Sequence, residues 1–156
     1  MSKKHNIEIV IVLDNIRSMH NIGSIFRTSD AFGVNSIFLC GICATPPNKE
    51  IHKTALGSTK TVKWQYFSST KSAIKQLVNE GYHIIAVEQT LNSSSLHQTT
   101  IPKDKIALVL GNEIKGVSTE ILSKANQYIE IQQHGTKASM NVSVVAGIVL
   151  WAVINK

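Results

Sequence analysis

The sequence has no hydrophobic run long enough to cross a membrane and no feature of a secreted precursor. Its longest apolar run, Val144 to Ile154, is shorter than the roughly 20 residues that a spanning helix needs. The basic residues 1–6 pass directly into a strand-like run without a cleavage site, so no signal peptide is expected. We therefore expect a cytoplasmic protein.

Internal repeats, linkers and a high fraction of charged residues are also absent. Charged residues make up 17% and apolar residues 43% of the 156 residues, which is typical of a folded globular chain rather than a disordered one. A chain of this length fits one domain. We expect a single domain over residues 1–156, with residues 1–6 as a short basic tail.

Arginine is scarce, although the chain is basic. Fourteen of the sixteen basic residues are lysine, and the two arginines are Arg17 and Arg27. The formal net charge of +6 is compatible with a polyanionic partner, because lysines beside phosphates release counterions. Five basic residues between two strand-like segments form either a solvated loop or a phosphate-contacting segment: Lys49, His52, Lys53, Lys60 and Lys63.

Metal-ligand spacing is missing from the six histidines, so no metal is assigned. The two cysteines, Cys40 and Cys43, have the spacing of a thioredoxin-like thiol pair. Such a pair needs a helix start to stabilise its thiolate, whereas residues 44–47 read as a loop. A single pair is also only half of a four-ligand zinc site. A thiol oxidoreductase is therefore the weakest of the functions considered.

Strand-like and helix-like patterns alternate along the chain. Short apolar runs or alternation predict strands, and apolar stripes at helical spacing predict helices. Strands are expected at residues 7–13, 36–40, 62–66, 83–87, 105–110 and 128–131, helices at 21–32, 69–80, 118–125 and 141–155, and a polar loop at 92–100. This order predicts an α/β fold with a mostly parallel sheet and helices on both faces. The last helix is apolar almost all round, so it must be buried within this chain or against a second one.

Three polar segments follow strands, at the edge of a parallel sheet where ligands bind. They are Asn15 to Arg27, Gly111 to Ser118 and Gln132 to Ser143.

In the first segment, Asn21 is a candidate helix cap, and Gly23 permits close approach of another backbone or a phosphate. Arg27 has a planar guanidinium suited to phosphate. A surface pair between Arg27 and Asp30 is the alternative.

The second segment has the glycine spacing of a nucleotide-binding loop, but Val117 stands where that loop requires lysine. An NTPase is therefore excluded. What remains is a glycine-flanked loop that offers backbone N–H groups and the Glu113 carboxylate, or else an ordinary strand-to-helix turn. In the third segment, Ser139 and Asn141 are both candidate caps of the following helix. Polar side chains held there away from solvent would need partners.

Together the three segments resemble the signature motifs of the SpoU/TrmH family, RNA ribose 2′-O-methyltransferases of the SPOUT superfamily. Asn21 to Gly33 is similar to the first motif, Leu110 to Val117 to the second and Ser139 to Ser143 to the third. The resemblance extends over about residues 9–151. Departures are small: Gln132 stands where the family usually has proline, and Met140 where leucine is common.

This resemblance implies a SPOUT fold with a deep C-terminal trefoil knot, and a homodimer, which would bury the apolar last helix. It implies tRNA or rRNA as partner and S-adenosylmethionine as cofactor. No membrane and no metal are expected, because of the short apolar run and the histidine spacing described above. The cofactor-binding positions would be Glu88, Leu110, Gly111, Ile131, Ser139 and Met140. The catalytic positions would be Arg27, which reaches the cofactor of the other subunit, together with Asn21, Glu113, Ser139 and Asn141.

The implied reaction is an in-line displacement by a ribose 2′-oxygen on the cofactor's methyl group. Since an arginine is effectively never deprotonated in a protein, Arg27 is an awkward general base. We hypothesise that Arg27 grips the adjacent phosphate and stabilises the developing alkoxide, while Glu113 and Asn141 order the loops. Two alternatives within the same fold are a base methyltransferase and a catalytically inactive RNA-binding module.

Overall fold

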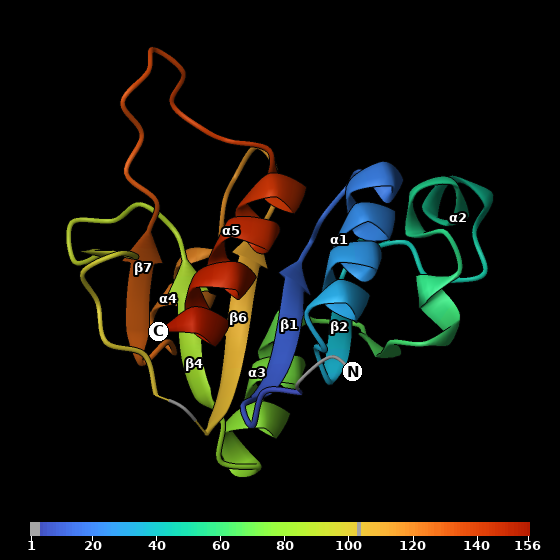
Figure 1. Ribbon diagram of the computed structural model, residues 1–156, viewed down its shortest axis with the longest axis horizontal. Helices are drawn as coiled ribbons and strands as arrows, with labels where there is room; N and C mark the ends of the chain where they lie inside the picture. The colour runs from blue at the N-terminus through green and yellow to red at the C-terminus, as the bar shows by residue number, and fades with distance from the viewer. Residues whose placement is uncertain (1–3, 103) are drawn as a thin grey trace.

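The computed structural model describes residues 4–102 and 104–156, so the first three residues of the expected basic tail lie outside it. A seven-stranded sheet with the order β3-β2-β1-β6-β4-β7-β5 forms the centre (Figure 1). All of its strand pairs are parallel. The strands are β1 Glu8–Asp14, β2 Ser36–Cys40, β3 Lys63–Phe67, β4 His83–Val87, β5 Ser94–Ser95, β6 Lys105–Gly111 and β7 Gln127–Glu130.

Helices cover both faces of the sheet (Figure 1). On one face, α1 (Met19–Ala31), α2 (Lys49–Ala55) and α5 (Val142–Asn155) enclose the larger hydrophobic core. On the other, α3 (Thr70–Asn79) and α4 (Thr119–Leu122) enclose the smaller one. The predicted α/β architecture is confirmed. The trefoil knot stays a prediction of the resemblance.

The central strands are buried because both of their faces are covered. In β1 every residue after Glu8 is buried, and β1 pairs along its full length with β6. This arrangement explains why these segments read as continuous apolar runs. It also brings the residues that follow Asp14 and Gly111 to the same edge of the sheet.

The first helix begins before the predicted position. Ser18, and not Asn21, is its N-cap, and the Ser18 side chain accepts a hydrogen bond from the Asn21 amide at 3.1 Å. The cap assigned to Asn21 was therefore wrong. Ser18 satisfies an orphan amide of the first turn, which leaves the Asn21 side chain available for other contacts.

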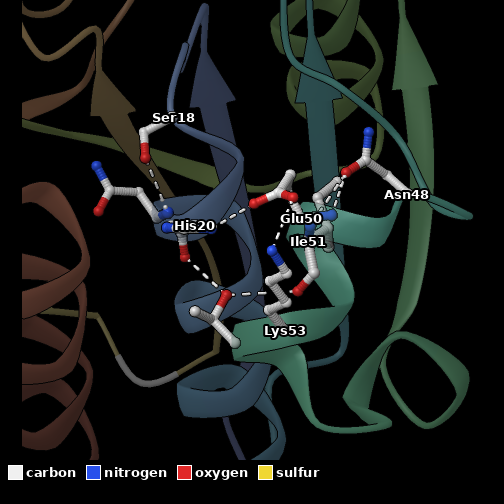
Figure 2. A network of polar contacts seen from close by, with 8 residues as sticks. Ser18, His20, Asn48, Glu50, Ile51 and Lys53 are labelled. Atoms are coloured by element: carbon white, nitrogen blue, oxygen red, sulfur yellow. Dashed lines mark hydrogen bonds and ion pairs between the residues drawn. The ribbon is translucent and has the colours of Figure 1, made fainter.

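Most of the basic stretch after β2 is helical, so the alternative of a solvated loop is wrong, and the alternative of a phosphate-contacting segment stays a prediction. Asn48 caps α2 by accepting hydrogen bonds from the amides of Glu50 and Ile51 (Figure 2). The helix ends at Ala55, and its C-cap residue Leu56 adopts a left-handed conformation. A short 3-10 helix, η1 (Ser58–Lys60), follows.

Two further details differ from the sequence-based expectation. The polar segment 92–100 contains β5, a two-residue strand that pairs with β7 at the sheet edge. Helix α4 has four residues, and the side chain of Ser118 forms no capping hydrogen bond, although Ser118 occupies the N-cap position. Strand β5 is too short to leave a periodic pattern, and α4 is shorter than the helix predicted at residues 118–125.

Within this chain, only one side of the last helix is buried. Ala146, Val149, Leu150 and Val153 are buried. On the opposite side Val144, Ile148 and Trp151 are exposed, Trp151 by 61%. Among the described residues no helix combines the length and the apolar character needed to span a membrane.

Candidate active site

The three polar segments converge beyond the carboxyl ends of the central strands. Residues 15–18 leave β1, residues 112–118 leave β6, and residues 131–141 leave β7 in a long loop that rises above the sheet before α5 (Figure 1). The parallel order of the sheet places these exits at one edge. Ligands bind at this edge in open α/β sheets.

All six positions expected to bind the cofactor line one pocket at this edge. The pocket lies over the ends of β4, β6 and β7 and is closed on one side by the loop before α5. Apolar side chains such as Val87, Leu110 and Val145 form part of the wall, and the carboxylates of Glu88 and Glu130 form another part. The predicted residues among its lining are Glu88, Leu110, Gly111, Ile131, Ser139 and Met140, with Glu113 from the catalytic set.

The Glu113 carboxylate joins the second segment to the first. Its two oxygens accept hydrogen bonds from the backbone amides of Arg17 and Ser18, each at 3.0 Å. Partial burial works to raise the pKa of Glu113, but the hydrogen bonds from these amides, and a smaller one from Asn21, outweigh it and lower the pKa. The carboxylate is therefore held in its charged form.

Asn21 and Asn141 extend this network to the third segment. The Asn21 side-chain amide donates to Glu113 at 3.4 Å, and the Asn141 side-chain amide donates to Asn21 Oδ1 at 3.2 Å. Asn141 also caps α5, because its Oδ1 accepts from the amide of Ser143 at 2.8 Å. A single chain of hydrogen bonds thus connects all three predicted motifs.

Asn112 organises the loop after β6, a role that the sequence reading missed. Its amide and carbonyl pair with those of Gly116, and its Oδ1 accepts from the amides of Ile114 and Lys115. Its Nδ2 donates to the carbonyl of Asn15 at 2.6 Å. The signal was local, because Asn directly after a strand is a common turn former.

Two carboxylates tie this loop to its neighbours. Glu88 accepts a hydrogen bond from the Val117 amide at 2.8 Å, so a predicted cofactor-binding residue also fixes the loop. Asp14, which the sequence reading did not single out, is 2% exposed and accepts from the Ser118 amide and the Thr70 hydroxyl. An aspartate that ends a buried strand was its only signal.

Arg27 lies apart from the pocket of its own chain. It is exposed on α1, and no ion pair joins it to an acidic residue in the described part of the chain. Asp30 instead accepts a hydrogen bond from Thr61 at 2.6 Å, so the alternative surface pair is not formed. Ser139, in contrast, lines the pocket but is exposed, so it needs no protein partner.

The cysteine pair is buried and lies away from a helix start. Burial, together with the neighbouring Cys43, raises the pKa of the Cys40 thiol to about 12, and burial raises the pKa of Cys43. Cys43 accepts a hydrogen bond from the Ile16 amide and donates to the Leu13 carbonyl. These features favour a structural role over thiol chemistry. Within residues 4–102 and 104–156 no cluster of His, Cys, Asp or Glu could hold a metal.

Comparison with known proteins identifies relatives that cover most of this chain. The model of the SpoU rRNA Methylase family matches residues 8–151. The tRNA (guanosine(18)-2'-O)-methyltransferase of Aquifex aeolicus is 31% identical over 153 residues, which cover 96% of this chain and 70% of that protein. The 23S rRNA (guanosine-2'-O-)-methyltransferase RlmB of Neisseria meningitidis serogroup B is 32% identical over 142 residues, which cover 91% of this chain and 56% of that protein.

The fold is shared with the solved structure of an rRNA methyltransferase. The AdoMet-bound rRNA methyltransferase of Sinorhizobium meliloti superposes with a TM-score of 0.88 at 26% identity, over 97% of this chain and 57% of that chain. The chain therefore spans little more than half the length of two of these three proteins.

Proposed function

Because the chain belongs to the SpoU rRNA methylase family, we propose that it transfers a methyl group from S-adenosylmethionine to a ribose 2′-hydroxyl of tRNA or rRNA. The observation that carries this proposal is the hydrogen-bond network around Glu113, which joins all three motifs beside one pocket. The family match over residues 8–151 supports a single methyltransferase domain. We place the protein in the cytoplasm with its RNA substrate.

The pocket suits S-adenosylmethionine by the chemistry of its lining. Val87, Leu110 and Ile131 offer apolar contact to an adenine ring, and Glu88 and Glu130 offer acceptors to ribose hydroxyls or a cationic group. A Cβ at Gly111 would overlap backbone atoms of Gly116 and Val117, so only glycine lets the end of β6 lie this close to the loop that follows it. When bound, S-adenosylmethionine supplies a methyl group activated by its sulfonium.

The chain's own residues would position the acceptor hydroxyl. Glu113 and Asn141 fix the loops on either side of the pocket through their hydrogen bonds to residues 17–21. Arg27 stays charged and would hold the phosphate next to the reacting ribose, which stabilises negative charge on the attacking oxygen. The proton of the hydroxyl would leave to solvent water.

Arg27 would act in the pocket of a partner subunit. It lies on α1, which packs against α5, and it does not contribute to the pocket of its own chain. The exposed side of α5, with Val144, Ile148 and Trp151, supports a homodimer in which these helices meet a second copy. Such a dimer would bring Arg27 of one subunit to the cofactor of the other.

The test is transfer of labelled methyl from S-adenosylmethionine to separate unmodified tRNA and rRNA pools, followed by nucleoside analysis. We expect one 2′-O-methylated nucleoside in one pool, with a loss of about 10²-fold or more in rate for Arg27→Ala. Cofactor binding, measured by calorimetry, should be unchanged in this variant. Absence of both methyl transfer and cofactor binding would contradict the enzyme assignment and favour an inactive RNA-binding module. If Arg27→Lys kept most of the methyl-transfer rate, the planar guanidinium of Arg27 would not be required for the reaction.

A further inference from the structure

The excess of positive charge comes from one part of the chain. Residues 15–75 contain eight Lys or Arg and two Asp or Glu, whereas residues 1–14 contain two of each kind and residues 76–156 six of each kind. The net charge of +6 therefore arises entirely within residues 15–75. This segment runs from the end of β1 to α3 and includes α1, α2, η1 and β3.

Much of this charge lies on adjoining elements at the β3 edge of the sheet. Helix α2 contacts η1, and η1 contacts both α1 and β3 (Figure 1). Lys49 begins α2, Lys60 ends η1 and Lys63 begins β3, and all three are exposed. Within the described residues, none of these three lysines forms an ion pair with an acidic residue.

The one acidic residue of α2 is already neutralised. Glu50 pairs with Lys53 at 3.0 Å and with His20 of α1 at 2.8 Å (Figure 2). These contacts, Lys53 first, lower the pKa of the Glu50 carboxyl. Glu50 therefore does not cancel the charge of Lys49, Lys60 and Lys63.

Helix α2 packs closely against α1, so the backbone positions of its lysines are fixed. A Cβ at Gly23 would overlap the Thr54 hydroxyl and the carbonyl of Ile51, so only glycine allows this approach. The Thr54 hydroxyl also donates to the His20 carbonyl at 2.9 Å. Ile51 and Ala55 are buried beneath the helix.

The same stripe of α1 carries Arg27. His20 contacts Glu50, Gly23 contacts α2, and Asp30 accepts from Thr61 just after η1. Spacings of three, four and three place His20, Gly23, Arg27 and Asp30 on one side of a helix. Arg27 thus lies at the border of the lysine-bearing surface.

We propose that the surface formed by α2, η1 and the start of β3, here called the α2–η1 surface, holds the RNA phosphate backbone that flanks the reacting nucleotide. The inference rests on the proposed function for the choice of RNA. An RNA strand whose phosphate is held by Arg27 would continue over Lys49, Lys60 and Lys63, where unpaired cations meet evenly spaced anions. Such contacts position the RNA without reading its sequence.

The experiment compares two charge-matched triple variants. K49Q/K60Q/K63Q removes three lysines from the α2–η1 surface, and K71Q/K75Q/K124Q removes three exposed lysines from α3 and the segment after α4, on the opposite face of the sheet. Both have the same net charge. Binding of a labelled, mixed-sequence 24-nucleotide RNA and of a tRNA transcript is measured against KCl concentration. Thermal unfolding and calorimetric binding of S-adenosylmethionine confirm that each variant is folded.

For the first variant we expect the slope of log affinity against log salt to fall by about 2 on single-stranded RNA, since each lost phosphate contact is worth about 0.7. In methyl transfer its KM for RNA should rise about tenfold while kcat stays within about twofold. The control should keep the wild-type slope and KM.

Equal losses in the two variants would overturn the proposal, because affinity would then follow net charge alone. Competition by polyglutamate as effective as that by RNA of equal charge would also overturn it and indicate an acidic protein partner. Salt-dependent RNA binding at this surface without any methyl transfer would instead contradict the proposed function and leave the α2–η1 surface in place.

Discussion

The side-chain amide of Asn141 donates a hydrogen bond to Oδ1 of Asn21, 3.2 Å away, although 120 positions separate the two residues. The same Asn21 side chain donates to Glu113 at 3.4 Å, so its oxygen and nitrogen are both occupied. An amide side chain placed between a donor and a carboxylate has one favourable orientation. Asn21 therefore links the loop before α5 to the loop after β6, and Glu113 is the charged end of the link.

Replacing Glu113 with glutamine should loosen the site. The amide NH2 of Gln would face the backbone N–H of Arg17 or Ser18, so one of the two hydrogen bonds is lost. Because the Glu113 side chain is largely exposed and only partly buried, we expect a loss of only about 1 kcal/mol in the free energy of unfolding, or roughly 2–4 °C in Tm. Methyl transfer should fall more than stability. Glu120→Gln, at an exposed surface pair with Lys71, is the control and should change neither; equal effects would contradict the network.

The stability that Glu113 contributes should depend on pH. Its pKa is lowered on folding, so the contribution is fully present above the ordinary value of 4.5 and is lost as pH falls through the lower folded-state pKa. The difference in Tm between the wild type and Glu113→Gln should be constant from pH 7 to about pH 5 and shrink toward pH 3. Other carboxyl groups, such as Glu50, titrate in both proteins and cancel. A difference that grows on acidification would refute the assignment.

Gly111→Ala should damage the cofactor pocket. The new Cβ would overlap backbone atoms of Gly116 and Val117, which cannot rotate away as a side chain could. We expect a loss of about 1–3 kcal/mol in stability and at least about tenfold weaker binding of S-adenosylmethionine. Gly135→Ala, in the loop before α5, meets no atom within 4 Å and should leave both unchanged. Calorimetry and thermal unfolding of the two variants test this difference, and equal effects of Gly111→Ala and Gly135→Ala would contradict it.

Two helical glycines should respond to alanine in opposite directions. At Gly23 a Cβ would push α2 away from α1, which should lower Tm and weaken RNA binding at the α2–η1 surface. At Gly147 the nearest atom to a Cβ is Thr28 Cγ2 at 3.7 Å, an ordinary contact. Gly147→Ala should therefore gain about 0.5–1 kcal/mol from helix propensity. If both variants lost stability to a similar extent, α5 would have to pack against α1 more closely at Gly147 than the 3.7 Å contact with Thr28.

Most of the fold could be predicted because a strand that is buried on both faces of the sheet has a continuous apolar sequence. The run from Ile9 to Leu13 is apolar throughout since both cores cover β1. Helix α2 was missed because only Ile51 and Ala55 of its seven residues are buried, which is too few to show a period among polar neighbours. Strand β5, with two serines, carried no pattern at all.

The candidate site was predictable where a side chain type stands out in a loop, as Glu113 and Asn141 do. Asp14 was not singled out because its partners Ser118 and Thr70 are distant in the chain. Asn112 left a local signal as a turn former, but its bond to the Asn15 carbonyl is also distant in the chain. Local sequence cannot show which of several polar residues after a strand will bond across the sheet edge. The N-cap of α1 was misplaced for a similar reason, since Ser18 and Asn21 are both good caps and three residues apart.

Trp151→Glu should dissociate the proposed homodimer and, with it, methyl transfer. Val144, Ile148 and Trp151 recur at spacings of four and three on the exposed side of α5, and a charge in that stripe would have to be buried against the second copy. Light scattering should show a monomer, whereas Leu91→Glu, at a fully exposed loop position, should stay dimeric. If Arg27 acts across the interface, the Trp151→Glu monomer loses methyl transfer even though Arg27 and its own pocket are intact. A dimeric Trp151→Glu protein with normal activity would place the contact elsewhere, and an active monomer would show that Arg27 serves the pocket of its own chain.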